Sequence, residues 1–156
     1  MARRHRFHSP NSTYHVMLRG NNGHDIFFSD DDRYRMCLLL QQSAERFGQK
    51  IEAYCFMTNH IHLAMRVSET SLSKFMHYLA FRYVRYINRK YKRIGHLFQG
   101  RFHSVLIDDT EYLKELIIIG ATPDILTFTT FQMSGEVLII LHTYPGVRQV
   151  ANYESC

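Results

Sequence analysis

The chain has 156 residues, of which 46% are hydrophobic and 21% charged, as is typical of one globular domain. Its three cysteines form no Cys-x-x-Cys pair, which excludes a disulfide scaffold and a cysteine zinc site and fits a reducing cytoplasm. No apolar run approaches the ~20 residues that span a bilayer, and none follows the basic N-terminus, so we expect neither a membrane segment nor a signal peptide.

Positive charge is concentrated in the first 120 residues, which hold 18 Lys and Arg against 11 Asp and Glu. Residues 121–156 hold one Arg and three acidic residues. No acidic residue stands between Glu69 and Asp108, whereas eight Lys and Arg do. A block of one sign attracts phosphate, and an ordinary solvated helix face would mix both signs. The charge pattern therefore favours contact with nucleic acid.

The first half of the chain predicts a strand and then a helix. Residues 12–20 are rich in β-branched and aromatic side chains, which indicates a strand, and the sequence Asn21-Asn22-Gly23 indicates a turn after it. Ser29 precedes three aspartates, which suits a helix N-cap followed by an acidic first turn. Gly48 is a natural end for this helix.

A hairpin and a second helix follow. Residues 50–57 and 60–67 indicate two strands joined by a tight turn at Thr58-Asn59. Thr70 or Ser71 then caps a longer helix, whose apolar residues recur at spacings of three and four. The basic residues of this helix fall mostly outside the apolar stripe, so we expect them on its exposed face.

The remaining elements complete a recognised arrangement. Residues 92–102 indicate a loop, residues 104–107 a short fourth strand, and Asp108 the approximate start of a third helix. The order β-α-β-β-α-β predicts an α+β, ferredoxin-like split βαβ fold, with a four-stranded antiparallel sheet, two helices on one face and a C-terminal helix. We expect one domain over residues 1–120 and an atypical tail over 121–156, in which 136–141 indicates a strand or a short buried segment.

The sequence His60-Ile61-His62 is the sharpest local motif. On a strand both imidazoles lie on one face, while Ile61 points to the other. Two such imidazoles can hold a divalent metal if another element supplies a third ligand. Two ordinary strand histidines are the alternative interpretation. A metal beside a basic surface suits phosphodiester transfer, because it would polarise the scissile phosphate.

These motifs carry a family resemblance. The segment FMTNHIHLAM, followed later by GHLFQGRF, resembles the HUH single-tyrosine transposases, above all their REP-associated (RAYT) branch. The opening YHVMLRGNNGHDIFF resembles the first strand and turn of that branch, and DDTEYLKELI resembles the start of its last helix. The resemblance runs from about Tyr14 to Ile117. Thr58 stands where the family frequently has proline.

The resemblance implies an enzyme that cuts and rejoins single-stranded DNA at hairpins of repeated palindromic elements, acting in the bacterial cytoplasm as a monomer or homodimer. It implies that His60 and His62 bind Mg²⁺ or Mn²⁺, and that a tyrosine of the last helix forms a 5′-phosphotyrosine bond with DNA. Together with the basic helix and loop, it implies an extended DNA-contacting surface. The candidate DNA-binding residues are Arg19, Asn21, Arg82, Arg85, Arg89, Lys90, Lys92, Arg93, His96, Gln99 and Arg101.

The last helix departs from the family pattern. Ile118 stands where arginine is expected, Ile119 where the nucleophilic tyrosine is expected, and Pro123 where a polar residue would assist the metal. Tyr112, two turns earlier, is the candidate substitute nucleophile, although a packing role is favoured for it. The pattern and the basic charge end together, which suggests a shifted reading frame. The nucleotides after codon 117 should then encode a tyrosine-bearing helix in another frame.

Three functional hypotheses follow. The first is a metal-dependent, transposase-like nuclease and strand transferase of reduced or lost activity. The second is a DNA-binding remnant that recognises hairpins without cutting them. The third is an initiator of rolling-circle replication or plasmid transfer, which uses the same two-histidine chemistry. Only cleavage by a tyrosine leaves a covalent protein–DNA adduct, which separates the first hypothesis from the second.

Overall fold

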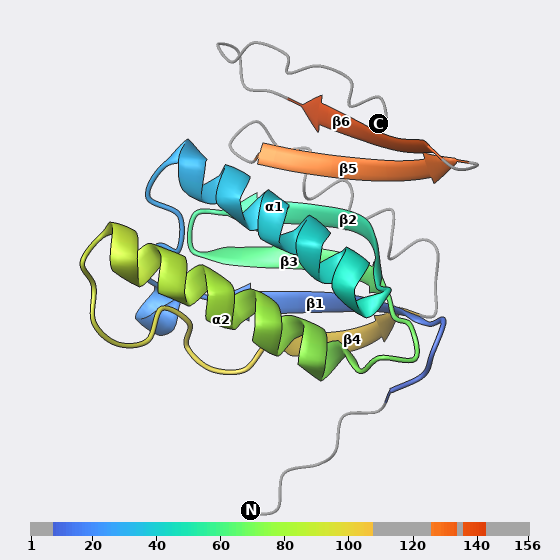
Figure 1. The fold of residues 1–156 in the computed structure, drawn as a ribbon, viewed down its shortest axis with the longest axis horizontal. Helices are drawn as coiled ribbons and strands as arrows, with labels where there is room; N and C mark the ends of the chain where they lie inside the picture. Colours follow the sequence, from blue (N-terminus) through green and yellow to red (C-terminus); the bar gives the residue numbers. More distant parts are fainter. Residues whose placement is uncertain (1–7, 108–125, 134–135, 143–156) are drawn as a thin grey trace, which may run out of the picture.

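The computed structural model describes residues 8–107, 126–133 and 136–142, which form an antiparallel sheet with two helices on one face (Figure 1). In chain order the elements are β1 (Thr13–Arg19), a 3-10 turn η1 (Asn21–Gly23), α1 (Asp30–Phe47), β2 (Lys50–Met57), β3 (His60–Arg66), α2 (Leu72–Lys90), β4 (His103–Ile107), β5 (Leu126–Met133) and β6 (Glu136–His142). The four predicted strands and both predicted helices are confirmed, and the strand ends differ from the prediction by at most one residue.

The sheet has the strand order β4-β1-β3-β2-β5-β6. Its first four strands and the two helices make up the predicted ferredoxin-like fold. The sheet continues beyond β2, because β5 pairs antiparallel with β2, and β6 pairs with β5. A strand at 136–142 agrees with one of the two interpretations of that segment, whereas β5 was not predicted. The expected third helix and the boundary at residue 120 lie outside the described residues.

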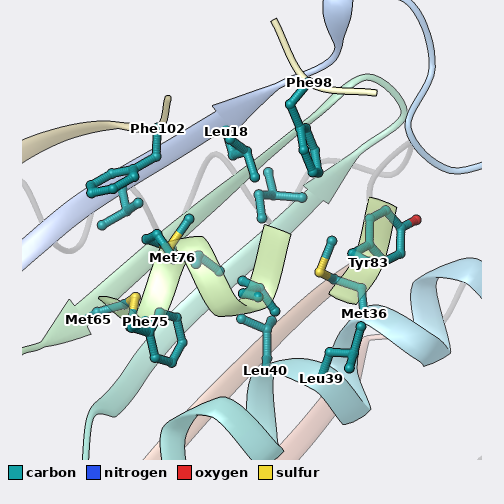
Figure 2. Packing of buried hydrophobic residues seen from close by; sticks show 14 of the residues in the cluster. Leu18, Met36, Leu39, Leu40, Met65, Phe75, Met76, Tyr83, Phe98 and Phe102 are labelled. Carbon is teal, nitrogen blue, oxygen red and sulfur yellow. The ribbon is translucent and has the colours of Figure 1, made fainter. Parts of the chain in front are cut away.

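The hydrophobic core lies between the sheet and the helix layer (Figure 2). Strands β1 and β3 contribute alternate residues to it, and Val16, Ile61 and Leu63 are almost completely buried. The helices contribute side chains at helical spacings, among them Leu39 and Phe75. Because side chains of a strand alternate between faces, the intervening residues of β1 and β3 point away from the helices. Neither α1 nor α2 is apolar enough along its length to cross a bilayer.

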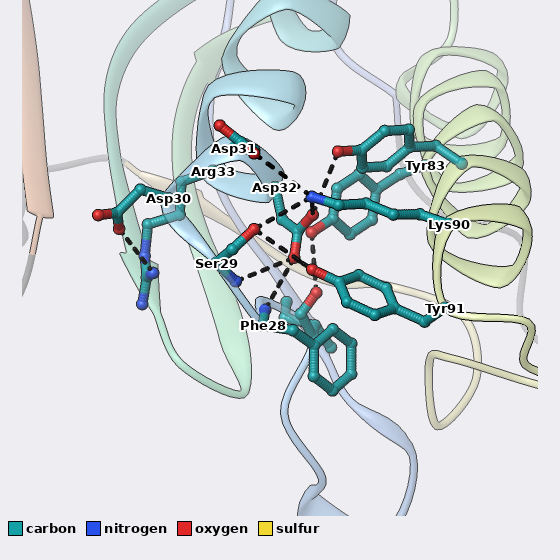
Figure 3. Close-up of polar contacts among 11 residues, drawn as sticks. Phe28, Ser29, Asp30, Asp31, Asp32, Arg33, Tyr83, Lys90 and Tyr91 are labelled. Atoms are coloured by element: carbon teal, nitrogen blue, oxygen red, sulfur yellow. Dashed lines mark hydrogen bonds and ion pairs between the residues drawn. The ribbon is translucent and has the colours of Figure 1, made fainter.

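A buried carboxylate joins the start of α1 to the end of α2 (Figure 3). Asp32 is 0% exposed and follows Ser29, the predicted N-cap. Its carboxylate accepts hydrogen bonds from the backbone N–H of Phe28 (2.9 Å) and Ser29 (3.0 Å), the hydroxyls of Tyr91 (2.8 Å) and Tyr86 (3.2 Å), and Nζ of Lys90 (2.8 Å). Burial raises the pKa of this carboxyl, but the hydrogen bonds outweigh burial and hold it below its ordinary value.

Candidate active site

The two histidines of the His-x-His motif lie together on the face of the sheet that the helices leave open. His60 is the first residue of β3, directly after the turn, and Ile61 between them points into the core. Their ring centroids are 4.8 Å apart and their planes are inclined by 72°. The predicted placement of both imidazoles on one face is therefore confirmed. Their role as metal ligands stays a prediction.

A third histidine, which the sequence analysis did not select, contacts this pair. His15 lies in β1, which pairs antiparallel with β3. Its Nε2 is 2.8 Å from Nδ1 of His62, and the two ring centroids are 5.1 Å apart. His15 is 5% exposed, so its ring is held in place by its surroundings. The sequence does place His15 in the middle of a predicted strand. Its contact with His62 could not be predicted, because it depends on the register between β1 and β3.

The amide of Asn59 contacts the other histidine. Its Oδ1 lies 2.6 Å from Nδ1 of His60, and its Nδ2 donates to the carbonyl oxygen of Gly23 at 3.1 Å. The turn itself is fastened to the segment after β1, because the backbone N–H of Gly20 donates to the carbonyl oxygen of Asn59 at 2.8 Å. The turn before the histidines and the turn after β1 thus form one hydrogen-bonded unit.

Burial keeps all three of these histidines uncharged near neutral pH. Burial is the main cause that lowers the pKa of His15, and the charge of His103 lowers it further. Burial also lowers the pKa of His60, and the Arg19 guanidinium adds to this effect. Burial, followed by the charges of His60 and His15, lowers the pKa of His62 to about 4. A neutral imidazole has one nitrogen lone pair with which it can bind a metal ion.

These pKa shifts predict that the metal-free protein loses stability in mild acid. The unfolded chain takes up protons on these histidines near pH 6.5, whereas folded His62 takes one up only near pH 4. The free energy of unfolding should therefore fall as the pH is lowered from about 6.5 towards 4. Asp32 contributes only below this window, because its pKa lies under its ordinary value of 3.8.

Urea titrations in EDTA at several pH values between 4.5 and 7.5 would measure this dependence. The variant His62→Gln removes one titrating group from the site and should flatten the profile. An equal slope in the variant and the wild-type protein would contradict the assignment of the acid sensitivity to His62.

Arg19 and the loop after α2 border the histidines. Arg19 is the register partner of His60 and is exposed, which places a permanent positive charge beside the imidazoles. The loop is fastened to this end of β1, because the N–H of Gln99 donates to the carbonyl oxygen of Arg19 at 3.0 Å and that of Asn21 to the carbonyl oxygen of Leu97 at 2.8 Å. The structure thus brings Arg19, Asn21 and Gln99, all predicted DNA contacts, to one end of the sheet.

The predicted DNA contacts of α2 lie elsewhere. Helix α2 lies on one face of the sheet (Figure 1) and packs its apolar stripe onto it. The histidines lie on the other face, so the basic residues outside that stripe are directed away from them. Arg82 lies over the ring of Tyr78, and Arg85 over the ring of Phe81, which is 53% exposed. Other predicted contacts are exposed to solvent: Arg89, Lys92, His96, Gln99 and Arg101. Arg93 is half-buried and lies over the ring of Phe28.

Lys90 has a structural partner that the sequence did not suggest. Its Nζ binds Asp32 and lies 3.8 Å from Asp31 (Figure 3). The hydrogen bond to Asp32 is the largest cause that raises the pKa of Lys90. The partners are 58 residues apart in the chain, which explains why the pair was not foreseen. A DNA contact of Lys90 stays a prediction, but much of its charge is matched by Asp32.

The structure does not place the candidate nucleophile. Tyr112, Ile119 and Pro123 lie outside the described residues. Among the residues that the structure describes, no cluster of three His, Cys, Asp or Glu side chains is arranged to hold a metal ion. The described site therefore offers two imidazoles on one face, with Arg19 beside them.

Comparisons with known proteins identify a family and similar folds. The family model "Transposase IS200 like" matches residues 8–116. That match ends next to Ile117, where the resemblance to the transposases was found to stop. No significant match to a curated protein was found.

Two solved structures share the fold. One is a REP-associated tyrosine transposase bound to a REP hairpin, with a TM-score of 0.60 and 14% identity over 74% of this chain and 67% of that chain. The other is a Deinococcus radiodurans R1 protein assigned as a transposase, with a TM-score of 0.54 and 13% identity over 76% of this chain and 95% of that chain. The fold, the paired histidines and the family match over most of the sequence lead to one conclusion: the chain belongs to the IS200-like transposase family.

Proposed function

We propose that the chain binds hairpin or single-stranded DNA of repeated palindromic elements and holds Mg²⁺ or Mn²⁺ between His60 and His62, as a member of the REP-associated branch. The observation that carries the proposal is the pair of uncharged imidazoles beside Arg19 in a transposase fold. The hairpin in the related solved structure supports the same kind of DNA partner.

The residues fit a divalent cation. Both imidazoles lie on one face, and Nδ1 of each is already hydrogen-bonded, so Nε2 is the nitrogen available to a ligand. Imidazole suits the borderline divalent ions, and DNA phosphate and water oxygens suit Mg²⁺ and Mn²⁺. Such an ion, when bound, would polarise the scissile phosphate. Arg19 would hold a neighbouring phosphate by charge and hydrogen bonds.

Strand cleavage requires a nucleophile in addition. In intact relatives a tyrosine hydroxyl would attack the phosphorus, the 3′ oxygen would leave, and the 5′ phosphate would become bonded to the tyrosine. Ile119 stands at the position where this tyrosine is expected. The end of the family match at residue 116 favours, as second candidate function, a protein that binds hairpins without cutting them.

A cleavage assay separates the two functions. The protein would be mixed with single-stranded hairpin DNA and Mn²⁺ or Mg²⁺, then analysed by denaturing gel and intact mass. A covalent adduct that His60→Ala abolishes would establish an enzyme, and Tyr112→Phe would show whether Tyr112 is the nucleophile. Hairpin binding without an adduct would establish the binding protein. A protein that neither binds nor cuts hairpins would overturn both.

Arg89→Ala is expected to lower the affinity for hairpin DNA and to make this affinity depend less steeply on salt concentration. Each phosphate contact that is lost removes about 0.9 from the slope of log affinity against log salt concentration on duplex DNA, and about 0.7 on single strands. Fluorescence anisotropy between 50 and 300 mM salt would measure both effects. Lys50→Ala is the matched control, because Lys50 is also an exposed cation but lies at the start of β2, outside the basic helix α2. Equal slopes for both variants would contradict a DNA contact of Arg89.

A further inference from the structure

The side-chain amide of Asn59 has an orientation that its two partners determine. The carbonyl oxygen of Gly23 can only accept a hydrogen bond, so the group that faces it at 3.1 Å must be the NH₂ of the amide. The amide oxygen therefore faces Nδ1 of His60, at 2.6 Å. Because the amide oxygen is itself an acceptor, the proton of this second hydrogen bond belongs to His60 Nδ1.

This proton decides which nitrogen of His60 can bind a ligand. A neutral imidazole carries one ring proton, so a proton on Nδ1 leaves the lone pair on Nε2. In water a neutral imidazole prefers the opposite tautomer, with its proton on Nε2. The contact with Asn59 therefore reverses the ordinary preference of His60 and turns a donor nitrogen into an acceptor.

His15 contacts Nδ1 of His62, as Asn59 contacts Nδ1 of His60. The 2.8 Å contact between Nε2 of His15 and Nδ1 of His62 holds one proton. When this proton lies on His62, the lone pair of His62 is on Nε2, as in His60. His15 is buried in β1, which pairs with the strand that carries His62, so the backbone register fixes the position of His15 Nε2 next to His62 Nδ1.

We propose that Asn59 and His15 are positioning residues that hold His60 and His62 in the tautomer with the proton on Nδ1, so that both Nε2 lone pairs serve one divalent cation. The cation and the choice of His62 as the donor to His15 rest on the function proposed above, whereas the tautomer of His60 rests on the hydrogen bonds of Asn59 alone. Partners of this kind outside the ligand set orient metal-binding histidines and raise their basicity.

The backbone makes the arrangement rigid. Asn59 is fastened at both its side chain and its carbonyl oxygen, by Gly23 and Gly20 respectively. The preceding carbonyl oxygen, that of Thr58, accepts the N–H of Ile26 at 2.9 Å. The turn after β1 thus fixes the amide, which fixes the proton of His60. The turn over Gly20–Gly23 is thereby linked to the proton position of His60.

Long-range ¹H–¹⁵N correlation spectra of the metal-free protein at pH 7.5 would read the tautomers directly. We expect His60 and His62 with the proton on Nδ1. In Asn59→Ala, His60 should change to the Nε2–H tautomer. In His15→Phe, which keeps a ring of similar size, the same change should occur at His62. A wild-type protein with either histidine protonated on Nε2 overturns the proposal for that residue.

Two variants separate positioning from folding. Asn59→Asp keeps an acceptor oxygen and should restore the Nδ1 proton on His60. Asn88→Ala removes an equivalent bond, from Nδ2 to the carbonyl oxygen of Gly95 at 3.1 Å, and should leave both tautomers unchanged. Dispersed amide spectra would show that each variant is folded. A tautomer of His60 that survives in Asn59→Ala would overturn the role of Asn59.

Titration of the same variants with Mn²⁺, followed by its electron paramagnetic resonance signal, tests the consequence for the cation. Affinity should fall about 10- to 100-fold in Asn59→Ala and in His15→Phe. Unchanged affinity would overturn their action on the cation. A wild-type protein that shows the expected tautomers but binds no Mn²⁺ would contradict the metal-dependent function and exclude the cation as ligand. The positioning of the rings is decided by the spectra alone.

Discussion

Replacing Asp32 with alanine is expected to lower the free energy of unfolding by about 3 kcal/mol or more, because several hydrogen-bond donors lose a buried acceptor at about 1–3 kcal/mol each. The carboxylate is fully buried and accepts hydrogen bonds from both the start of α1 and the end of α2. Without it, the backbone N–H groups of Phe28 and Ser29 lose this acceptor. Urea unfolding followed by circular dichroism would measure the difference.

Asp31→Ala provides a matched control in the same helical turn. The side chain of Asp31 is 87% exposed and lies 3.8 Å from Lys90, so its removal should change the free energy of unfolding by less than about 0.5 kcal/mol. The variant Asp32→Asn, which keeps the shape and loses the charge, should lie between the two. Equal effects of the two alanine variants would show that the acidic first turn, rather than the buried carboxylate, stabilises the helix.

Replacing Gly20 with alanine is expected to cost about 3 kcal/mol or more. Gly20 has an ordinary extended backbone, with φ −62° and ψ 146°, so the effect does not come from glycine's conformational freedom. An added Cβ would overlap the carbonyl oxygen of His24 and approach the side chain of Ile26 to 2.9 Å. The backbone would have to move, and with it the N–H that holds Asn59.

Gly100→Ala tests whether the expected loss is steric. No atom lies within 4 Å of a Cβ built at Gly100, so this variant should unfold within about 0.5 kcal/mol of the wild-type protein. Thermal unfolding would compare the two, and the imidazole signal of His60 would report whether the turn has shifted. A Gly20→Ala protein as stable as Gly100→Ala would mean that the close approach at Gly20 relaxes without cost.

The central fold followed from periodicity. Alternation in β1 and β3 places Val16 and Ile61 in the core, and the apolar stripe of α2 covers them. The strand β5 was not predicted, although Thr127–Phe131 has the composition of a strand. The sequence does not show with which edge strand of the sheet this segment would pair. Pairing with β2 is a long-range event that local propensity cannot specify.

The candidate site was predicted in part for a similar reason. The placement of His60 and His62 on one face needs only the two-residue period of a strand. Asn59 was assigned to a turn, and its contact with Gly23 depends on how two distant turns dock. His15 meets His62 only through the pairing of β1 with β3. The contacts of His15 with His62 and of Asn59 with Gly23 thus join segments that lie far apart in the chain.

The added strands change what the rim of the sheet offers to other molecules. In the four-stranded arrangement β2 would be an outer strand, whereas β5 now covers it and β6 has a strand partner on one side only among the described strands. The sequence of β6, EVLIILH, is apolar and contains one acidic residue. Apolar strands at the rim of a sheet are templates for pairing between chains. Self-association of this protein at high concentration would therefore be expected to begin at β6, away from both the basic helix and the histidines.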